Sequence, residues 1–377
     1  MTKIGTITFH GAQNFGSVLQ SYALQEFVKD LYAEAGKDCF YNVINYRTKF
    51  QKSFYSIYKS VKNPKNIIKN AVAFKHCSAL KVKSQKFEDF LSNYINLTDE
   101  VSETDELEKF ESAFDFYISG SDQIWNVRAS DFESAYYLDF VKRGKKISYA
   151  ASFGPLKIDW SVYNKEKYSD LLSQYSAISV RETGSADNVK ELIGKDCKVN
   201  VDPTFLLTKE QWRKVQSDAN YNDGKYILLY CLEPSKEQLS MAKSISKKLN
   251  LPILVTRYNN KNDMINGFVK KYDCGPLDFL SYIDNAALVL SSSFHGTAFS
   301  MIYNKPFYVF GGMKDSRISS ILKIAGIEDR SIEKYEDVDR VNLEKVNFSV
   351  VNDFIGLERQ RSKEYLFNSL NIQLCDE

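Results

Sequence analysis

The sequence of 377 residues has few of the side chains that bind metal ions, with three histidines and six cysteines. The cysteines are dispersed, at Cys39, Cys77, Cys197, Cys231, Cys274 and Cys375. None of them forms a close pair such as Cys-x-x-Cys, so we expect no structural zinc site and no other metal. The N-terminus does not resemble a secretion signal, so we expect no disulfide framework and a cytoplasmic, reducing compartment.

The sequence also has no long apolar run, because no apolar stretch approaches the ~18 residues that a membrane-spanning helix needs. The excess of positive charge is small: 50 Lys and Arg against 48 Asp and Glu give a net charge of +2. This balance provides no global field for binding nucleic acid. Hydrophobic residues make up 44% of the chain and aromatic residues 14%, which is enough for two cores. A chain of this length is typical of two or three domains.

Strands and helices alternate along the sequence. The first segment predicts a strand at Ile4–Phe9, a polar loop, a helix whose apolar residues recur from Leu19 to Leu31, and a strand at Tyr41–Tyr46. A second alternating set begins with a strand at Tyr226–Cys231 and a helix at Lys236–Leu249. This order favours an α/β fold with parallel sheets.

The domain boundary is predicted near residue 207. We expect an N-terminal domain at 1–207, a C-terminal domain at 208–345, and a helical segment at 346–377 that packs back towards the N-terminal domain. Two α/β domains that face one another would place the ligand cleft between them, at the carboxyl ends of their strands.

A basic insertion at about 47–90 lies within the first domain. Its residues 47–86 contain no acidic side chain, whereas residues 99–111 are rich in Asp and Glu. The basic residues, interleaved with aromatic ones, are Arg47, Lys49, Lys52, Lys59, Lys62, Lys65, Lys69, Lys75, Lys81, Lys83 and Lys86. Three interpretations stay open: a solvated face paired with the acidic run, contact with an anionic membrane surface, and, with the least support, nucleic acid.

The segment Ser291–Thr297 joins a predicted buried strand to the start of a helix. Backbone N–H groups and the positive end of the helix dipole meet at such a junction, which suits a phosphate or a carboxylate. A histidine there, His295, can transfer a proton beside the bound anion. Further candidates for binding this anion are Ser292, Ser293, Gly296 and Thr297. The alternative is that His295 only stabilises the loop by hydrogen bonding.

Other candidates follow strands of the first predicted sheet. A guanidinium at Arg181 can hold a carboxylate or phosphate with two hydrogen bonds, and its alternative is an ion pair with a neighbour such as Glu182. Asp122 and Gln123 can orient sugar hydroxyls, or Asp122 can simply shape its loop. The remaining candidates form the first loop after a strand, and are Asn14, Gly16 and Ser17. Gly16 allows a ligand close to the backbone, and Asn14 or Ser17 can cap the helix.

Five motifs together resemble the polysaccharide pyruvyl transferase family, over about residues 4–311. They are Asn14-Phe15-Gly16-Ser17-Val18-Leu19-Gln20, Gly120-Ser121-Asp122-Gln123-Ile124-Trp125-Asn126, Val180-Arg181-Glu182, Val201-Asp202-Pro203-Thr204 and Ser293-Phe294-His295-Gly296-Thr297. The resemblance implies a GT-B-like fold of two Rossmann-type domains with parallel sheets facing an interdomain cleft. It also implies an enzyme that transfers a pyruvyl group from phosphoenolpyruvate to a sugar, forming a pyruvate ketal and releasing phosphate, with no cofactor.

The resemblance gives His295 the role of proton transfer and Arg181 that of holding the donor. The acceptor would be a glycan or a lipid-linked saccharide of cell-surface polysaccharide synthesis, reached at the inner face of the membrane. One position departs from the pattern: some family members carry an arginine where this chain has Ser293, so the anion would depend on Ser292, Ser293, Arg257 or Arg317. A GT-B nucleotide-sugar glycosyltransferase and a non-catalytic glycan-binding homologue are the alternative functions.

Overall fold

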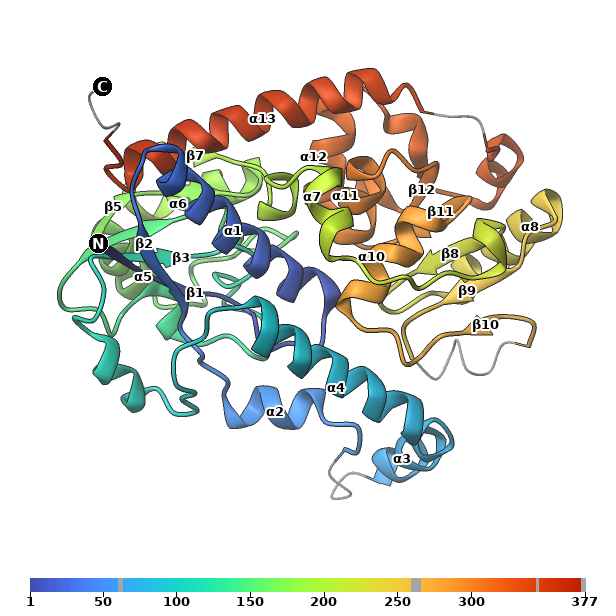
Figure 1. Ribbon diagram of the computed structural model, residues 1–377, viewed down its shortest axis with the longest axis horizontal. Helices are drawn as coiled ribbons and strands as arrows, with labels where there is room; N and C mark the ends of the chain where they lie inside the picture. The colour runs from blue at the N-terminus through green and yellow to red at the C-terminus, as the bar shows by residue number, and fades with distance from the viewer. Residues whose placement is uncertain (60–63, 259–265, 344–345, 374–377) are drawn as a thin grey trace. The chain divides into compact units, whose positions relative to one another are not determined.

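The computed structural model describes residues 1–59, 64–258, 266–343 and 346–373, and the chain divides into two compact units (Figure 1). Unit 1 comprises residues 1–55, 91–207 and 356–377, and unit 2 comprises residues 56–90 and 208–355. The chain therefore passes from unit 1 to unit 2 twice, after Tyr55 and after Leu207, and the second passage lies at the predicted position. It returns to unit 1 within two helices, after Phe90 and after Ile355.

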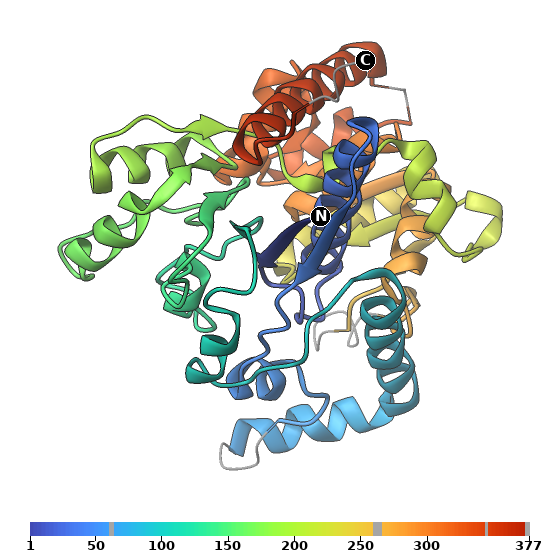
Figure 2. The same cartoon turned by 60° about the vertical axis from the view of Figure 1, so that its left-hand side comes forward.

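Unit 1 contains a parallel sheet with the strand order β2-β1-β3-β4-β5. Its strands are β1 (Thr2–Ile7), β2 (Cys39–Val43), β3 (Phe116–Ser119), β4 (Lys145–Ser148) and β5 (Tyr175–Ala177). A separate parallel pair is formed by β6 (Ser179–Val180) and β7 (Lys198–Val199). The helices are α1 (Phe15–Glu34), α2 (Lys49–Tyr55), α5 (Lys165–Ser173) and α6 (Thr183–Ile193). Figure 2 shows α5 and α6, in green, side by side.

Unit 2 contains a parallel sheet with the strand order β10-β9-β8-β11-β12-β13. Its strands are β8 (Ile227–Tyr230), β9 (Ile253–Val255), β10 (Val269–Lys270), β11 (Leu288–Ser291), β12 (Phe307–Phe310) and β13 (Ser331–Ile332). The helices are α3 (Pro64–Lys75), α7 (Lys209–Val215), α8 (Lys236–Leu249), α10 (Pro276–Asn285), α11 (Phe294–Ile302) and α12 (Ser316–Ile324). Two helices run from one unit into the other, α4 (Cys77–Tyr94) and α13 (Phe348–Ser369).

Short 3-10 turns connect these elements, at Asp105–Phe110, Ser134–Tyr137, Pro203–Phe205, Asn222–Gly224, Gly312–Lys314, Glu328–Arg330 and Tyr335–Arg340.

Local sequence explains the best-defined elements. Every residue of β8, β11 and β12 is buried, as expected for central strands of a parallel sheet covered by helices. The N-cap of helix α8 is Ser235, whose hydroxyl accepts from the backbone of Gln238 in a capping box, and its C-cap is Asn250 in the left-handed conformation. The core of unit 1 is aromatic, with Trp125 and Tyr137 stacked at a centroid distance of 5.3 Å.

Residues 56–90 belong to unit 2, whereas the sequence placed them in the N-terminal domain. The reason lies in the side chains of α4: Ala79 and Leu80 pack against the core of unit 2, and Lys86 forms an ion pair with Asp278 at 2.7 Å. At the other end of the chain, unit 1 takes in only the part of the helical segment that begins at Gly356. There Arg359 donates to the carbonyls of Phe205 and Leu207.

The first part of the basic segment pairs with the acidic run, as the first of the three interpretations held. Arg47 and Lys52 form ion pairs with Glu100, and Lys49 does so with Glu103. Lys62 lies outside the described residues, and the side chains of Lys65 and Lys69 are likewise not described. The charge of the segment is therefore partly balanced within unit 1.

Candidate active site

The junction of β11 and α11 forms the candidate site in unit 2. The strand ends at Ser291, Ser293 is the N-cap of α11 in an extended conformation, and His295 is the second residue of the helix. Every residue of α11 is buried, and His295 is 7% exposed. The first turn of any α-helix directs backbone N–H groups beyond its N-terminus, and the helix dipole adds partial positive charge there. This junction is suited to a small anion.

Hydrogen bonds hold the junction against the end of β8. The Ser291 hydroxyl donates to the Tyr230 carbonyl at 2.9 Å, and the same hydroxyl accepts from the Ser293 backbone at 2.9 Å. A Cβ at Gly296 would lie 2.3 Å from the Ser291 hydroxyl oxygen and 2.9 Å from the Tyr230 ring. Glycine is therefore required at position 296, because any side chain would push the helix start away from the strand.

Thr297 closes the first turn of α11. Its hydroxyl donates to the Ser293 carbonyl at 3.0 Å, and its backbone N–H donates to the same oxygen at 3.1 Å. These two hydrogen bonds fix the first turn of α11, which carries both the His295 imidazole and the backbone of Gly296.

Arg181 follows β6 in unit 1, and carboxylates surround its guanidinium. Nη1 lies 3.0 Å from Asp202 and 3.5 Å from Asp122, and Nε lies 3.5 Å from Glu182. Burial alone would lower the pKa of Arg181, but the three carboxylates together raise it above its usual value. The arginine side chain is 1% exposed, so its charge is balanced inside the protein. The predicted alternative, an ion pair with Glu182, is thus present, and Asp122 and Asp202 form two further ion pairs with the same guanidinium.

Asp122 is hydrogen-bonded to two other predicted site residues, Ser17 and Gln123. The Ser17 hydroxyl donates to Asp122 at 2.8 Å, and the carboxylate also accepts from the backbone of Gln123 at 2.9 Å, which shapes the loop. The side chain of Asn14 caps α1 by accepting from the backbone of Gly16 at 3.1 Å.

The structure therefore brings the predicted site residues together in two groups. Unit 1 holds Asn14, Gly16, Ser17, Asp122, Gln123 and Arg181, and unit 2 holds Ser292, Ser293, His295, Gly296 and Thr297. That His295 and Arg181 meet across a cleft stays a prediction.

The two arginines considered as substitutes for the family arginine lie in different environments. Arg317 forms two hydrogen bonds with Asp315, at 3.0 and 2.6 Å, close to its own helix start. Arg257 follows β9 and is half-buried, and its charge acts on Tyr230 at the end of β8.

Comparison with protein families decides the classification. The model of the polysaccharide pyruvyl transferase family matches residues 14–312, which is most of the chain. This chain belongs to the polysaccharide pyruvyl transferase family. It is accordingly assigned to a family of transferases, and the resemblance seen in the five motifs is confirmed.

Solved structures support the fold. The chain is similar to the MnaA protein of S. aureus in a structure with UDP, with 11% identity, a TM-score of 0.53, and coverage of 100% of this chain and 99% of that one. It is similar to UDP-N-acetylglucosamine 2-epimerase from Rickettsia bellii, with 12% identity, a TM-score of 0.51, and coverage of 99% and 100%. A comparison with curated proteins finds no match. The GT-B-like α/β fold, with two Rossmann-type units and parallel sheets, is confirmed.

Sequence reasoning did not select three residues that the structure places beside the predicted ones. Asp202 is the ion-pair partner nearest to Arg181, Tyr230 contacts the start of α11, and Lys83 is buried in α4. Asp202 stands in one of the family motifs and so left a signal in the sequence, whereas Lys83 stands in the basic run with Lys81 and Lys86 and left none.

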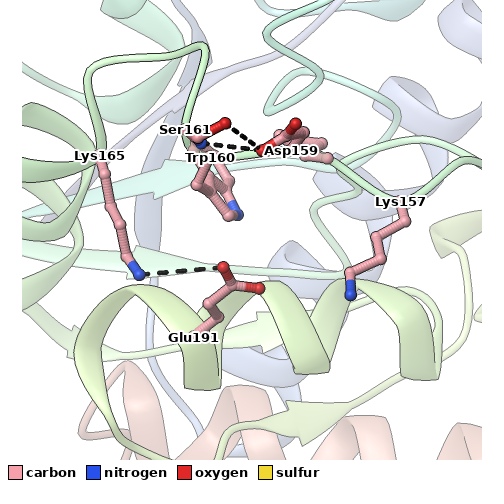
Figure 3. A pocket seen from close by; sticks show the side chains of 7 residues that line it. Lys157, Asp159, Trp160, Ser161, Lys165 and Glu191 are labelled. Atoms are coloured by element: carbon pink, nitrogen blue, oxygen red, sulfur yellow. Dashed lines mark hydrogen bonds and ion pairs between the residues drawn. The ribbon is translucent and has the colours of Figure 1, made fainter.

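A surface hollow in unit 1 of about 630 Å³ is lined by other residues (Figure 3). Trp160 forms its wall and donates to Asn188, and Lys165 pairs with Glu191 at 3.8 Å across it. The lining contains none of the predicted site residues, so this hollow is separate from both groups.

Metal clusters and membrane-spanning helices are both absent from the part of the chain that the structure describes. There, no cluster of three or more His, Cys, Asp or Glu side chains is arranged to hold a metal ion. Nor does any helix within those residues combine the length and apolar character needed to cross a bilayer.

Proposed function

We propose that this member of the family transfers a pyruvyl group from phosphoenolpyruvate to a sugar of a glycan or lipid-linked saccharide. The product is a pyruvate ketal across two hydroxyls, phosphate is released, and the modified glycan supplies cell-surface polysaccharide. The reaction needs no cofactor besides the donor. Membership of the family supports transfer to a sugar, and the chemistry of the residues supports an anionic donor.

The position of His295 is the observation that carries this proposal. The imidazole stands in the first turn of α11, next to the backbone of Gly296 and the hydroxyl of Ser293, at the carboxyl edge of a parallel sheet. Ligands of open α/β sheets bind at this edge. A dianionic donor bound by the helix start would therefore lie beside an imidazole, a group that can both donate and accept a proton.

The proposed reaction begins with transfer of a proton from the His295 imidazolium to the methylene carbon of phosphoenolpyruvate. The adjacent carbon becomes oxocarbenium-like, and a sugar hydroxyl adds to it while its proton passes to the phosphate group. The bond from this carbon to the phosphate oxygen then breaks, and phosphate leaves with the electron pair. A second hydroxyl adds to the same carbon, loses its proton to the neutral imidazole, and closes the ketal. General acid–base catalysis of this kind contributes about 10²–10⁴-fold.

Incubation with phosphoenolpyruvate and candidate glycans tests the proposal, with phosphate release and an added pyruvyl mass as readouts. His295→Asn should lower turnover about 10²–10⁴-fold. His76→Asn is a matched control, because His76 lies in the same unit and packs against Tyr272 at 5.1 Å. Unchanged turnover in His295→Asn would refute the assignment. Turnover of a nucleotide sugar in place of phosphoenolpyruvate would identify a glycosyltransferase, and glycan binding without turnover of either would identify a binding protein.

Arg181 acts in this scheme by holding Asp122 and Asp202, which in turn place the loops of the acceptor side. A direct contact between Arg181 and the donor would require one of its ion pairs to open. Arg181→Lys should lose most activity, because a point charge cannot satisfy several carboxylates as a planar fork does. A lower kcat with an unchanged KM for phosphoenolpyruvate would support positioning, whereas a raised KM would support donor binding. Wild-type kinetics would exclude both roles.

The acceptor sugar is assigned to the loops around Asp122. Gln123, Ser17 and Asn14 provide hydroxyl and amide groups there, and Gly16 leaves space for the close approach of a ligand. Ser17→Ala should weaken glycan binding and leave phosphoenolpyruvate binding unchanged, as measured by calorimetry with each ligand.

Contact with the inner face of the membrane is part of the proposed function. In α3, Ile67 and Phe74 are spaced seven residues apart, which places them on one face of the helix, and Phe74 is 73% exposed. Wild-type protein should co-sediment with vesicles that contain phosphatidylserine at low salt, and Ile67→Ser with Phe74→Ser should not. Equal sedimentation of the two proteins would remove α3 from the contact.

A further inference from the structure

A second hollow in unit 1, of about 820 Å³, lies along the outer edge of β5. Most of its lining comes from three segments: β5 itself, the chain from Lys195 to Asn200, and the last turns of α13. All three belong to unit 1, and Figure 1 shows β5, β7 and the C-terminal end of α13 close together. The volume is typical of pockets that bind small ligands. The lining contains none of the predicted site residues.

Strand pairing and α13 explain why this hollow exists. In the described sheets, β7 pairs with β6 and not with β5, so β5 has a partner only on its inner side, in β4. Helix α13 is fixed beside this open edge by two hydrogen bonds. The Tyr365 hydroxyl donates to the Ser148 carbonyl at 2.8 Å, and the Asn200 amide donates to the Ser362 hydroxyl at 3.2 Å. The walls of the hollow are therefore regular elements that are held in place.

The hollow lies at the amino edge of the sheet of unit 1. Leu172, near the end of α5, and Ile193, the last residue of α6, line it just before the chain enters β5 and β7. Ser369, the last residue of α13, lines it as well. The C-terminal ends of three helices therefore meet here, and the last carbonyl groups of each add partial negative charge. Arg181 instead follows the carboxyl end of β6, so the hollow is separate from the predicted site of unit 1.

Neutral hydrogen-bonding groups line the hollow. Asn200 is 3% exposed, and its side-chain oxygen has no hydrogen-bond partner among the described residues. A buried acceptor without a partner is costly, so an O–H group of a ligand would stabilise it. Further polar groups and two aromatic rings are provided by Ser176, Asn368, Ser369, Tyr175 and Tyr365. This mixture suits a sugar, which presents hydroxyl groups at its edges and C–H groups on its faces.

The charges of the lining nearly balance. Three cations and two anions contribute to it: Lys195, Lys198, Arg361, Asp196 and Glu364. Arg361 also forms an ion pair with Glu358 at 2.5 Å. Because the three helix ends add partial negative charge, a phosphate or a carboxylate is disfavoured in the hollow. The chemistry therefore favours a ligand that is uncharged and rich in hydroxyl groups.

We propose that this hollow is a second saccharide-binding site, which takes a segment of an uncharged glycan at the amino edge of the sheet of unit 1. The side-chain oxygen of Asn200 accepts a hydrogen bond from a sugar hydroxyl there. The inference goes beyond the proposed function, because it requires neither phosphoenolpyruvate nor the acceptor loops around Asp122. A long glycan held in the hollow has a raised effective concentration at other sites of the same chain.

Calorimetry of the full chain tests the site. The probes are uncharged hexasaccharides of glucose, galactose, mannose and N-acetylglucosamine, with a hyaluronan hexasaccharide as the anionic probe. Wild type should bind at least one of the uncharged probes, and Asn200→Leu should weaken that binding about 3–30-fold. Hyaluronan should bind about tenfold more weakly, since three helix ends oppose its carboxylates. Tighter binding of hyaluronan, or no binding of any uncharged probe, overturns the inference.

A second pair of variants tests the hollow without changing Asn200, and replaces the first test if Asn200→Leu fails to fold. Ser176 and Ser173 are both exposed, but only Ser176 lines the hollow. Ser176→Tyr fills the hollow and should remove most of the binding, whereas Ser173→Tyr should leave it unchanged. Thermal unfolding without ligand checks that both variants are folded. Unchanged binding in Ser176→Tyr, or an equal loss in both variants, overturns the inference.

The same variants separate this site from the proposed function. Glycan binding that is lost in Ser176→Tyr, in a protein whose wild type turns over no phosphoenolpyruvate, would support the saccharide site and refute pyruvyl transfer. Turnover of phosphoenolpyruvate together with glycan binding that is equal in wild type and Ser176→Tyr would support the transfer and refute the site.

Discussion

Replacement of Arg181 by methionine is expected to lower the free energy of unfolding of unit 1 by about 3–5 kcal/mol, the range for breaking a buried ion pair. The guanidinium is enclosed by three carboxylates, and the nearest one, Asp202, is fully buried. Methionine has a similar length but leaves these negative charges close together without their cation. The carboxylates of Asp122 and Glu182 lie 3.5 Å from the removed group, so the repulsion extends to them.

Urea unfolding followed by tryptophan fluorescence measures this loss. Trp125 and Trp160 lie in unit 1, and Trp212 lies in unit 2, so a Trp212→Phe background reports unit 1 alone. For a unit of this size, each kcal/mol should also shift the thermal midpoint by roughly 2–4 °C. Because two compact units need not unfold together, the transition of each is analysed separately.

Two variants control the interpretation. Arg213→Met breaks an ion pair with Asp284 at 2.8 Å, but Arg213 is 46% exposed, so the loss should stay within about 1 kcal/mol. Adding Asp202→Asn to Arg181→Met should recover part of the stability, because one of the three negative charges is removed. If Arg181→Met unfolds at the same urea concentration as wild type, the carboxylates do not depend on this cation and the reasoning is refuted.

Two further predictions concern unit 2. Gly296→Ala should destabilise the unit by about 1–3 kcal/mol and lower turnover, because its Cβ would overlap Ser291 and Tyr230. Gly184→Ala, in open space within a helix of unit 1, should stabilise that unit by up to about 1 kcal/mol. Urea unfolding of each variant with Trp212 retained measures both effects, and equal effects would show that the contact at 296 is not tight. Burial lowers the pKa of Lys83 from 10.5 to about 8, so the unfolded chain binds more protons between these values and stability should rise with pH by up to about 3 kcal/mol. Lys83→Met should lack this rise, and parallel pH profiles for wild type and variant would contradict it.

Much of the framework followed from local sequence. The helix at Lys236–Leu249 was predicted to the residue, since it has its own stop signals and apolar pattern. The chain between Tyr175 and Val180, by contrast, divides into β5 and β6, which lie in different sheets. A local pattern does not contain this division, because partner strands decide it.

The site shows the same division between local and tertiary information. Chain order alone indicated a strand, a histidine and a helix start at Ser291–Thr297, because the residues that build this junction are consecutive. The surroundings of Arg181 depend on Asp122 and Asp202, which are distant in the chain, so the sequence could name one neighbouring carboxylate and missed the others.

The sequence by itself determined the α/β alternation, the boundary at Leu207 and the family, because turn residues, apolar periodicity and short motifs are local properties. Tertiary structure decided that residues 56–90 join unit 2 and that Lys83 is buried against Phe87. A lysine in a basic run looks like any other until the packing of α4 removes it from water, and burial is a property of the fold.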